Sequence, residues 1–226
     1  MERVSLAKKV LSENDRLAAE LRARFREHGI FCLNLISSPG AGKTSLLEKT
    51  LESLPRAERV AVLTGDIHTD NDARRLARFG FPAQQITTGG ACHLDARMVE
   101  RALSAWRLAD LDILFIENVG NLVCPTSYDL GEAVKVVVLS VTEGEDKPLK
   151  YPGIFAKAGL LVLNKIDLLP YVPFDLALAR ENARRVHPDV RIVEVSCTTG
   201  EGLDGWLGWL KEQREAARVA AAKQTG

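Results

Sequence analysis

The stretch LNLISSPGAGKTSLL, residues 33–47, decides the fold of this chain. Its apolar first part is typical of a buried strand, its small residues of a turn, and its last part of a helix. In a strand–loop–helix of this kind, backbone N–H groups and the positive end of the helix face phosphate oxygens. We therefore predict a phosphate-binding loop. The alternative is a glycine-rich turn before an unrelated helix.

The side chains of this loop have distinct predicted roles. Lys43 reaches the β- and γ-phosphates of a nucleotide, and Thr44 offers its hydroxyl to Mg²⁺. The loop departs from the usual pattern at one position, because Ser37 stands where a glycine is common. The residues that we expect to bind the nucleotide here are Pro39, Gly40, Ala41, Gly42, Lys43, Thr44 and Ser45.

Short apolar runs alternate with longer helical patterns along the rest of the chain. This alternation predicts an α/β fold, a mostly parallel sheet with helices on both faces, preceded by an amphipathic N-terminal helix. Residues 142–152 have little helix or strand character and predict a polar excursion after a strand. The predicted strands are 31–37, 59–64, 83–87, 112–118, 135–141, 159–164 and 191–196, and the predicted helices that follow the first strand are 44–54, 70–79, 95–108, 175–186 and 203–221.

The composition excludes several classes of protein. The 226 residues are 46% hydrophobic and 27% charged, which is typical of a globular protein rather than a disordered or collagen-like one. The 30 basic and 30 acidic side chains cancel, so no bulk charge attracts nucleic acid or an anionic membrane. No signal-peptide core and no run of about 20 apolar residues is found, and four cysteines are too few for a disulfide framework. We expect a cytoplasmic protein with neither nucleic acid nor membrane as a partner.

The tetrad Asn-Lys-Ile-Asp, residues 164–167, follows a predicted strand and resembles the guanine-specificity motif of G proteins. A carboxylate at Asp167 can accept hydrogen bonds from the N1–H and the exocyclic amine of guanine, a donor pattern that adenine lacks. This favours GTP over ATP. Ser196 and Cys197 follow the last predicted strand and resemble the base-contacting loop of such proteins, with Cys197 expected to pack there rather than to bind a metal. The nucleotide-binding residues predicted in these two segments are Asn164, Lys165, Asp167, Ser196 and Cys197.

Two acidic residues follow predicted strands and can serve Mg²⁺ and hydrolysis. Asp66 ends one apolar run, and Glu117 begins a segment, 117–120, that resembles the acidic-x-x-Gly switch of GTPases. In that switch the carboxylate lies near Mg²⁺ or its water, and the N–H of the glycine, here Gly120, faces the γ-phosphate. Asp70 is either a water-orienting residue or the cap of the next helix. The predicted catalytic residues are Lys43, Asp66 and Glu117, and the predicted Mg²⁺ ligands, direct or through water, are Thr44, Asp66 and Glu117.

A second group of residues has the chemistry of a transition-metal site. Cys92 and His93 precede a predicted helix, and Cys124 lies just beyond the switch segment. Thiolate and imidazole ligands suit Zn²⁺ or Ni²⁺. Three ligands are one fewer than in a closed zinc site, so water, a backbone donor or a second chain would complete the set. Ordinary packing remains the alternative. Cys32 is expected in the core, and His68 has no ligand spacing.

Together these segments resemble the HypB family of GTPases, which help to insert nickel during the maturation of nickel–iron hydrogenases. Its Cys-His and Glu-Asn-Val-Gly-Asn-Leu-Val-Cys-Pro segments distinguish it from the related UreG family of urease nickel-insertion GTPases, whose pattern places Cys-Pro-His together. The segments that carry the resemblance are 29–46, 65–66, 88–96, 117–125, 129–132, 143–152 and 164–167.

The resemblance implies a SIMIBI-class P-loop GTPase whose cofactors are GTP, Mg²⁺ and either Ni²⁺ or Zn²⁺. It implies metal binding on Cys92, His93 and Cys124 near the interface of a homodimer promoted by GTP. The expected division of the chain is an N-terminal helix at 1–28, a P-loop GTPase domain at 29–221 and a frayed tail at 222–226. Slow GTP hydrolysis is a further expectation, because no arginine finger is evident in the sequence.

Many bacterial members of the family carry an N-terminal cysteine-rich motif or histidine run, whereas the first histidine here is His28 and the first cysteine is Cys32. We therefore expect dependence on partners, namely a HypA-type nickel chaperone and the hydrogenase large-subunit precursor. Two other interpretations remain. One is a GTPase chaperone for another metallocentre or for a cobalamin enzyme. The other is a metal-binding scaffold in which the nucleotide only stabilises a dimer.

Overall fold

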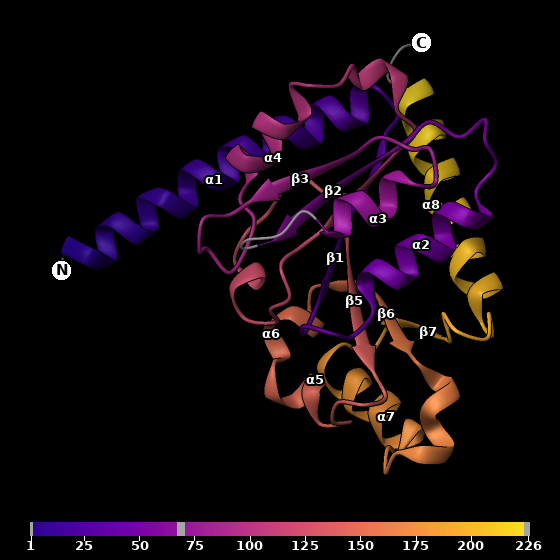
Figure 1. The fold of residues 1–226 in the computed structure, drawn as a ribbon. Helices are drawn as coiled ribbons and strands as arrows, with labels where there is room; N and C mark the ends of the chain where they lie inside the picture. Colours follow the sequence, from indigo (N-terminus) through magenta and orange to yellow (C-terminus); the bar gives the residue numbers. More distant parts are fainter. Residues whose placement is uncertain (1, 67–70, 224–226) are drawn as a thin grey trace.

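The computed structural model describes residues 2–66 and 71–223, and within them one sheet of seven parallel strands organises the chain (Figure 1). The strand order is β3-β2-β4-β1-β5-β6-β7, so β1 lies at the centre between β4 and β5. The predicted α/β fold is confirmed, and the sheet is wholly rather than mostly parallel. The strands are β1 (Phe31–Ser37), β2 (Val60–Asp66), β3 (Ala83–Thr87), β4 (Ile113–Glu117), β5 (Val134–Ser140), β6 (Ala158–Asn164) and β7 (Arg191–Val195).

Helices cover both faces of this sheet because the central strands are apolar on both sides. Leu33 and Leu35 of β1 lie in the cluster beneath α2 and α8, whereas Cys32 points to the opposite face, beneath α1 and α4. The helices are α1 (Glu2–Glu27), α2 (Lys43–Ser53), α3 (Asn71–Ala77), α4 (Ala96–Leu103), α5 (Lys147–Lys150), α6 (Pro152–Phe155), α7 (Leu176–Val186) and α8 (Leu203–Ala222), with 3-10 turns η1 (Leu108–Asp110), η2 (Cys124–Thr126) and η3 (Ile166–Tyr171).

The N-terminal helix α1 shares the core of the domain. Its residues Leu21 and Phe25 are buried in the same cluster as Leu103 of α4 and Leu130. Gly131 allows this close approach, because a Cβ there would lie 2.7 Å from Cβ of Leu21, and its φ of +83° also favours glycine. The predicted N-terminal helix is confirmed, and it packs as an integral layer of the fold.

Three predicted segments differ from the structure. Residues 142–152, predicted without regular structure, include α5 and the start of α6, because Pro148 and Pro152 occupy first-turn positions where proline is tolerated. The predicted helix 95–108 ends at Leu103 and is followed by η1. The predicted helix 203–221 continues one residue further, to Ala222, and residues 224–226 of the predicted tail lie outside the described residues.

Within residues 2–66 and 71–223, no helix combines the length and apolar composition that crossing a membrane requires.

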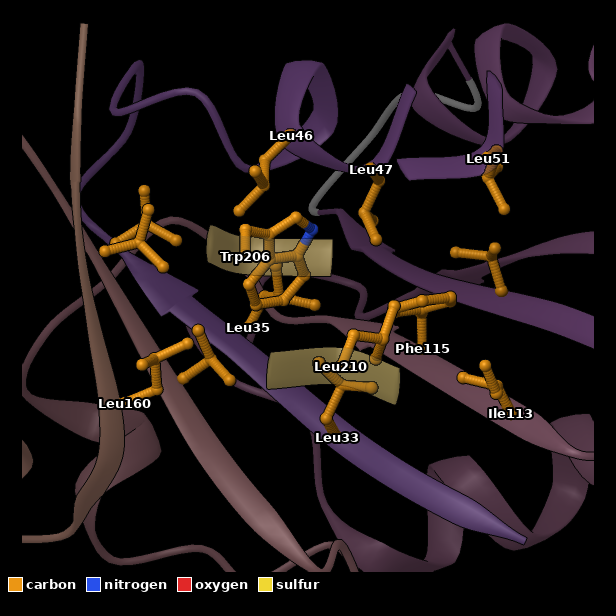
Figure 2. Packing of buried hydrophobic residues seen from close by; sticks show 14 of the residues in the cluster. Leu33, Leu35, Leu46, Leu47, Leu51, Ile113, Phe115, Leu160, Trp206 and Leu210 are labelled. Carbon is orange, nitrogen blue, oxygen red and sulfur yellow. The ribbon is translucent and has the colours of Figure 1, made fainter. Parts of the chain in front are cut away.

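Trp206 lies within the hydrophobic cluster between α2, α8 and the sheet (Figure 2). Trp206 is fully buried, and its indole Nε1–H donates to Oγ1 of Thr50 over 2.7 Å. The ring also stacks on Trp209, with centroids 5.4 Å apart. Since the hydroxyl of Thr50 in turn donates to the carbonyl of Leu46, this contact satisfies both buried donors.

Replacing this hydroxyl tests the packing of α8 on α2. Thr50→Val preserves the side-chain shape but leaves the indole N–H of Trp206 without its acceptor, so we expect the free energy of unfolding to fall by about 1–3 kcal/mol. Urea denaturation measures the change. Ser53→Ala, on the exposed part of the same helix, is the control and is expected to change stability by less than about 0.5 kcal/mol. Equal effects of the two variants would contradict a special role for this contact.

Candidate nucleotide and metal site

The loop between β1 and α2 depends on glycine at its last position. Gly42 caps α2 with a φ of +101°, and a Cβ there would lie 2.3 Å from Nδ2 of Asn164. That same Nδ2 donates to the carbonyl of Ala41 over 2.9 Å, and Nζ of Lys165 donates to the carbonyl of Gly40 over 2.8 Å. The predicted phosphate loop and the predicted guanine motif therefore contact each other directly, although more than 120 residues separate them in sequence.

The end of the guanine motif lies against the loop after β7. Oδ1 of Asp167 accepts a 2.6 Å hydrogen bond from Oγ of buried Ser196. Lys165 has a φ of +64°, a left-handed conformation that is unusual for a residue other than glycine and turns the chain toward the phosphate loop. Cys197 packs against the core, and burial raises the pKa of its thiol to about 11. It is therefore a neutral packing group beside the motif.

The serine that replaces the usual first glycine contacts the loop lysine. Nζ of Lys43 donates to Oγ of Ser37 over 2.9 Å, and both residues are buried. Burial lowers the pKa of the Lys43 ammonium, while the nearby Glu117 carboxylate opposes that shift. The departure from the common loop pattern thus gives the lysine a hydroxyl partner.

Glu117, the last residue of β4, has the environment of a cation ligand. Its Oε1 accepts a 2.7 Å hydrogen bond from Oγ1 of Thr44, while its buried Oε2 has no hydrogen-bond partner among the described residues. Burial raises the pKa of this carboxyl to about 7. A buried carboxylate oxygen without a donor, beside a threonine hydroxyl, fits Mg²⁺, which prefers oxygen ligands. Asp66 ends β2 at the same edge of the sheet as Glu117. It lies two residues beyond Thr64, which is opposite Glu117 in the register of β2 and β4.

A cleft of about 440 Å³ is lined by Lys43, Thr44 and Glu117, whereas Asp66 is not among its lining residues. Arg75 of α3 also lines it and was not identified from the sequence; its guanidinium pairs with Glu48 over 2.7 Å. In the sequence, only the position of Arg75 shortly after the end of β2 indicates that it could reach the cleft. Its ion pair with Glu48 depends on tertiary packing and has no local signal. The predicted residues that line the cleft are Pro39, Gly40, Gly42, Lys43, Thr44, Ser45, Glu117, Gly120 and Lys165. Ala41 and Asn164 are buried behind the loop, and Asp167, Ser196 and Cys197 form the adjoining group.

The three predicted metal ligands lie together. The donor atoms of Cys92, His93 and Cys124 are all within 4.8 Å of one another, with 2.8 Å between the two Sγ atoms and 3.8 Å from Cys92 Sγ to His93 Nδ1. All three residues are half-buried. Asn121 orients the second half of the set, because its Oδ1 accepts hydrogen bonds from the N–H groups of Val123 and Cys124.

The electrostatics of this cluster suit a soft or borderline cation. Partial burial lowers the pKa of His93, which favours the neutral imidazole that can bind a metal. Its ring stacks on Tyr128 with centroids 3.8 Å apart. The hydrogen bond between the two thiols raises the pKa of Cys124. Two sulfur donors and one nitrogen match Zn²⁺ or Ni²⁺ and leave room for a further ligand.

The remaining sequence expectations concern single residues. Cys32 is buried in β1, and burial raises the pKa of its thiol well above the usual value, as expected of a core residue. Asp95, beside the metal ligands, caps α4 by accepting from the N–H of Met98. His68 and Asp70 lie outside the described residues.

Comparisons with known proteins agree with this geometry. The family model of the CobW/HypB/UreG nucleotide-binding domain matches residues 32–194. The hydrogenase maturation factor HypB of Azotobacter chroococcum mcd 1 is 54% identical over 223 residues, which cover 97% of this chain and 73% of that protein. The crystal structure of HypB from Helicobacter pylori in complex with nickel is 40% identical, with a TM-score of 0.85 over 90% of this chain and 96% of that chain.

A more distant structure supports the fold alone. The 54 kDa protein of the signal recognition particle from Aeropyrum pernix K1, solved with GDP, is 14% identical and has a TM-score of 0.53 over 83% of this chain and 49% of that chain. The two chains therefore share the arrangement of a parallel sheet covered by helices.

The close approach at Gly42 leads to a prediction for nucleotide binding. Gly42→Ala places a methyl group against Nδ2 of Asn164 at a backbone conformation that alanine rarely adopts. We expect nucleotide affinity to fall by about 100-fold or more, since the cost of the clash adds to about 1–2 kcal/mol for the left-handed backbone. Fluorescent nucleotide titration measures this.

Gly208→Ala is the control, because Gly208 lies in α8 with open space around its Cβ position. We expect unchanged nucleotide affinity and a slightly more stable helix. Tight nucleotide binding by Gly42→Ala would contradict the assigned geometry of the loop.

Proposed function

This chain belongs to the HypB hydrogenase maturation factors of the CobW/HypB/UreG nucleotide-binding family, and we propose that it is a GTP-hydrolysing metallochaperone that delivers nickel during maturation of nickel–iron hydrogenase. The observation that carries the proposal is the convergence of Cys92, His93 and Cys124 within 4.8 Å. Cys124 lies on the segment that follows the switch residues Glu117 and Gly120. A change at the nucleotide site can therefore reach the metal ligands through a short length of chain.

The proposed preference for guanine rests on Asp167. Its carboxylate is the terminal acceptor of the motif and is oriented by the hydroxyl of Ser196. Asn164 and Lys165 meanwhile support the carbonyls of the phosphate loop, so base recognition and phosphate binding share one rigid element. This arrangement supports GTP as the nucleotide.

Hydrolysis is proposed to use residues at the ends of β1, β2 and β4. Lys43 neutralises charge on the phosphates, and Thr44, Glu117 and Asp66 are the residues that would hold Mg²⁺ directly or through water. When bound, Mg²⁺ supplies positive charge that stabilises the developing negative charge of phosphoryl transfer. Arg75 lines the cleft but its guanidinium is paired with Glu48, so we expect slow basal turnover.

Nickel is proposed as the cargo, with zinc as the competing ion. The donor set supports this choice, as does the nickel complex of the Helicobacter pylori relative. Three donors leave the coordination incomplete, which supports a GTP-promoted homodimer in which a second subunit completes the site. A HypA-type chaperone and the hydrogenase large-subunit precursor are the proposed partners. Thiolate ligands require a reducing compartment, which is the cytoplasm in this proposal.

Native mass spectrometry tests the metal site and the dimer together. With a nonhydrolysable GTP analogue and limiting Ni²⁺, we expect the wild-type protein to form a nucleotide-bound dimer that holds nickel. Cys92→Ala removes one of three donors and is expected to lose the nickel while keeping the nucleotide. The matched control is Cys32→Ala, which removes a buried thiol of β1 and should retain the metal. Nickel retained by Cys92→Ala, or absent from every variant, would overturn the proposed site.

Guanine recognition is tested by reversing one hydrogen-bond pattern. Asp167→Asn keeps an acceptor for Ser196 but replaces the other carboxylate oxygen with a donor. We expect GTP affinity to fall by about 10–100-fold, as loss of a bidentate pair costs about 1–3 kcal/mol, and xanthosine triphosphate affinity to rise. Competition binding with the two nucleotides gives both values. Asp175→Asn, at a helix cap where either residue serves, should leave the preference unchanged.

A further inference from the structure

A buried amide interrupts the apolar central strand. Asn34 is fully buried in β1, opposite Ile116 of β4 and Lys135 of β5. A buried amide is tolerated only when its groups are hydrogen-bonded. Its Oδ1 accepts from Nδ2 of Asn118 over 3.2 Å, and its Nδ2 donates to Oε1 of Glu132 over 3.3 Å. The residue therefore joins the two ends of the connection between β4 and β5.

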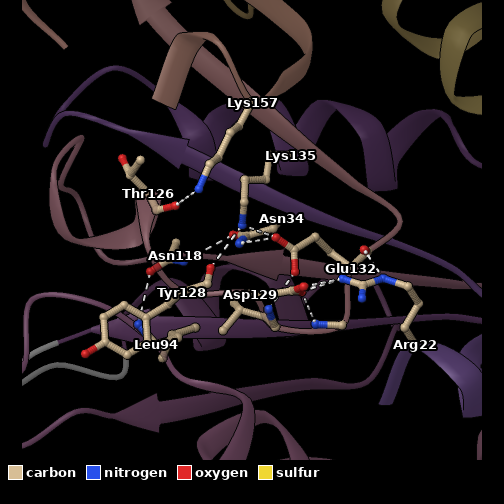
Figure 3. Close-up of polar contacts among 12 residues, drawn as sticks. Arg22, Asn34, Leu94, Asn118, Thr126, Tyr128, Asp129, Glu132, Lys135 and Lys157 are labelled. Atoms are coloured by element: carbon tan, nitrogen blue, oxygen red, sulfur yellow. Dashed lines mark hydrogen bonds and ion pairs between the residues drawn. The ribbon is translucent and has the colours of Figure 1, made fainter. Parts of the chain in front are cut away.

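Asn118 connects the switch segment 117–120 to residues 92–94, the metal segment that contains Cys92 and His93 (Figure 3). It directly follows Glu117, and its Oδ1 accepts from the N–H of Leu94 over 3.2 Å. Leu94 in turn directly follows His93. The side chain of Leu94 is fully buried against β2, where a Cβ on Gly65 would lie 2.8 Å from it. The metal segment is thus fixed at its base by one side chain of the switch.

Through Glu132, the hydrogen bonds of Asn34 also lead to a residue that contacts the metal ligand His93. Glu132 is buried and forms an ion pair with Lys135, and its Oε2 accepts from the N–H of Leu130 over 2.7 Å. Nζ of Lys135 also donates to the carbonyl of Tyr128 over 3.0 Å, and the ring of Tyr128 stacks on His93. Figure 3 shows the hydrogen bonds and ion pairs that lead from Leu94 to Tyr128. His93 therefore contacts both ends of one network, through the chain neighbour Leu94 and through the ring of Tyr128.

We propose that Asn118 is the positioning residue that couples the nucleotide state of the switch to metal affinity, with Asn34, Glu132 and Lys135 as its fixed support; this inference rests on the proposed function. Movement of 117–120 displaces the Asn118 side chain. Because the N–H of Leu94 is buried and bonded to that side chain, the metal segment follows rather than leaving the group unsatisfied. The support from Glu132 holds Tyr128 in place, so His93 shifts relative to its stacking partner.

The test measures Ni²⁺ affinity by chelator competition in two nucleotide states, GDP and a nonhydrolysable GTP analogue. The readout is the ratio of the two affinities for one protein, because general loosening weakens both affinities and leaves the ratio unchanged. For the wild type we expect a ratio of about tenfold or more, within the usual range of allosteric coupling. Asn118→Ser, whose hydroxyl is too short to reach the N–H of Leu94, is expected to reduce the ratio to less than about twofold.

The control is Asn182→Ala, which removes another buried amide whose Nδ2 donates to the carbonyl of Glu145. It is expected to keep the wild-type ratio. If Asn118→Ser does not fold, Asn118→Asp replaces it: the carboxylate still accepts from Leu94 but cannot donate to Asn34. We expect that variant to reduce the ratio at least about threefold.

Two negative results have different meanings. A wild-type ratio of one would overturn nucleotide-gated metal handling, and this inference with it. A wild-type ratio of tenfold that persists in a folded Asn118 variant would leave the proposed function intact and overturn the role of Asn118.

Discussion

The parallel direction of all seven strands is the constraint on which the rest of the structure depends. Parallel strands bring their carboxyl ends to one edge of the sheet, and ligands bind there in open α/β folds. Four of these strands end in a residue of the site or lead directly into it. The strand ends concerned are Ser37 of β1, Asp66 of β2, Glu117 of β4 and Asn164 of β6. The nucleotide cleft and the metal ligands are therefore neighbours because of topology, not because of their spacing in sequence.

In and beside this sheet, polar groups occupy buried positions where apolar residues would avoid the free-energy cost of removing a polar group from water. Asn34 and Glu132 are buried, and the carboxyl of Glu117 has its pKa raised by the same burial. Replacing such networks with apolar residues often leaves stability unchanged or improves it, so their presence is weak evidence for a role in stability. Asn34 and Glu132 lie between the switch segment 117–120 and the residues next to the metal ligands. Their burial there is better explained by a need to hold these segments in one specific arrangement. Asn34 is hydrogen-bonded to both Asn118 and Glu132, and a network joined in this way has few alternative geometries.

The sequence predicted the elements well where local signals were strong. The strand at 31–37 and the phosphate loop are marked by a clear apolar run and small residues, and the structure contains them at the same positions. The strand at 83–87, predicted from a weaker pattern, is also present. The helices after Asp146 were missed because Pro148 and Pro152 indicate a break, whereas proline in the first turn begins a helix as readily. The contact of Lys165 with Gly40 and the stacking of Tyr128 on His93 could not be predicted. Both join residues that only strand order and register bring together.

Under the proposed function, the composition of the metal site is suited to release as well as capture. A closed site of four thiolates or imidazoles holds zinc as part of the fold. Here two thiols and one imidazole are half-buried and supply three donors. Metal binding to thiols depends on the loss of their protons, so affinity at such a site is sensitive to its surroundings. A site of three donors can pass its ion to a protein that supplies more ligands, which is the property that delivery requires.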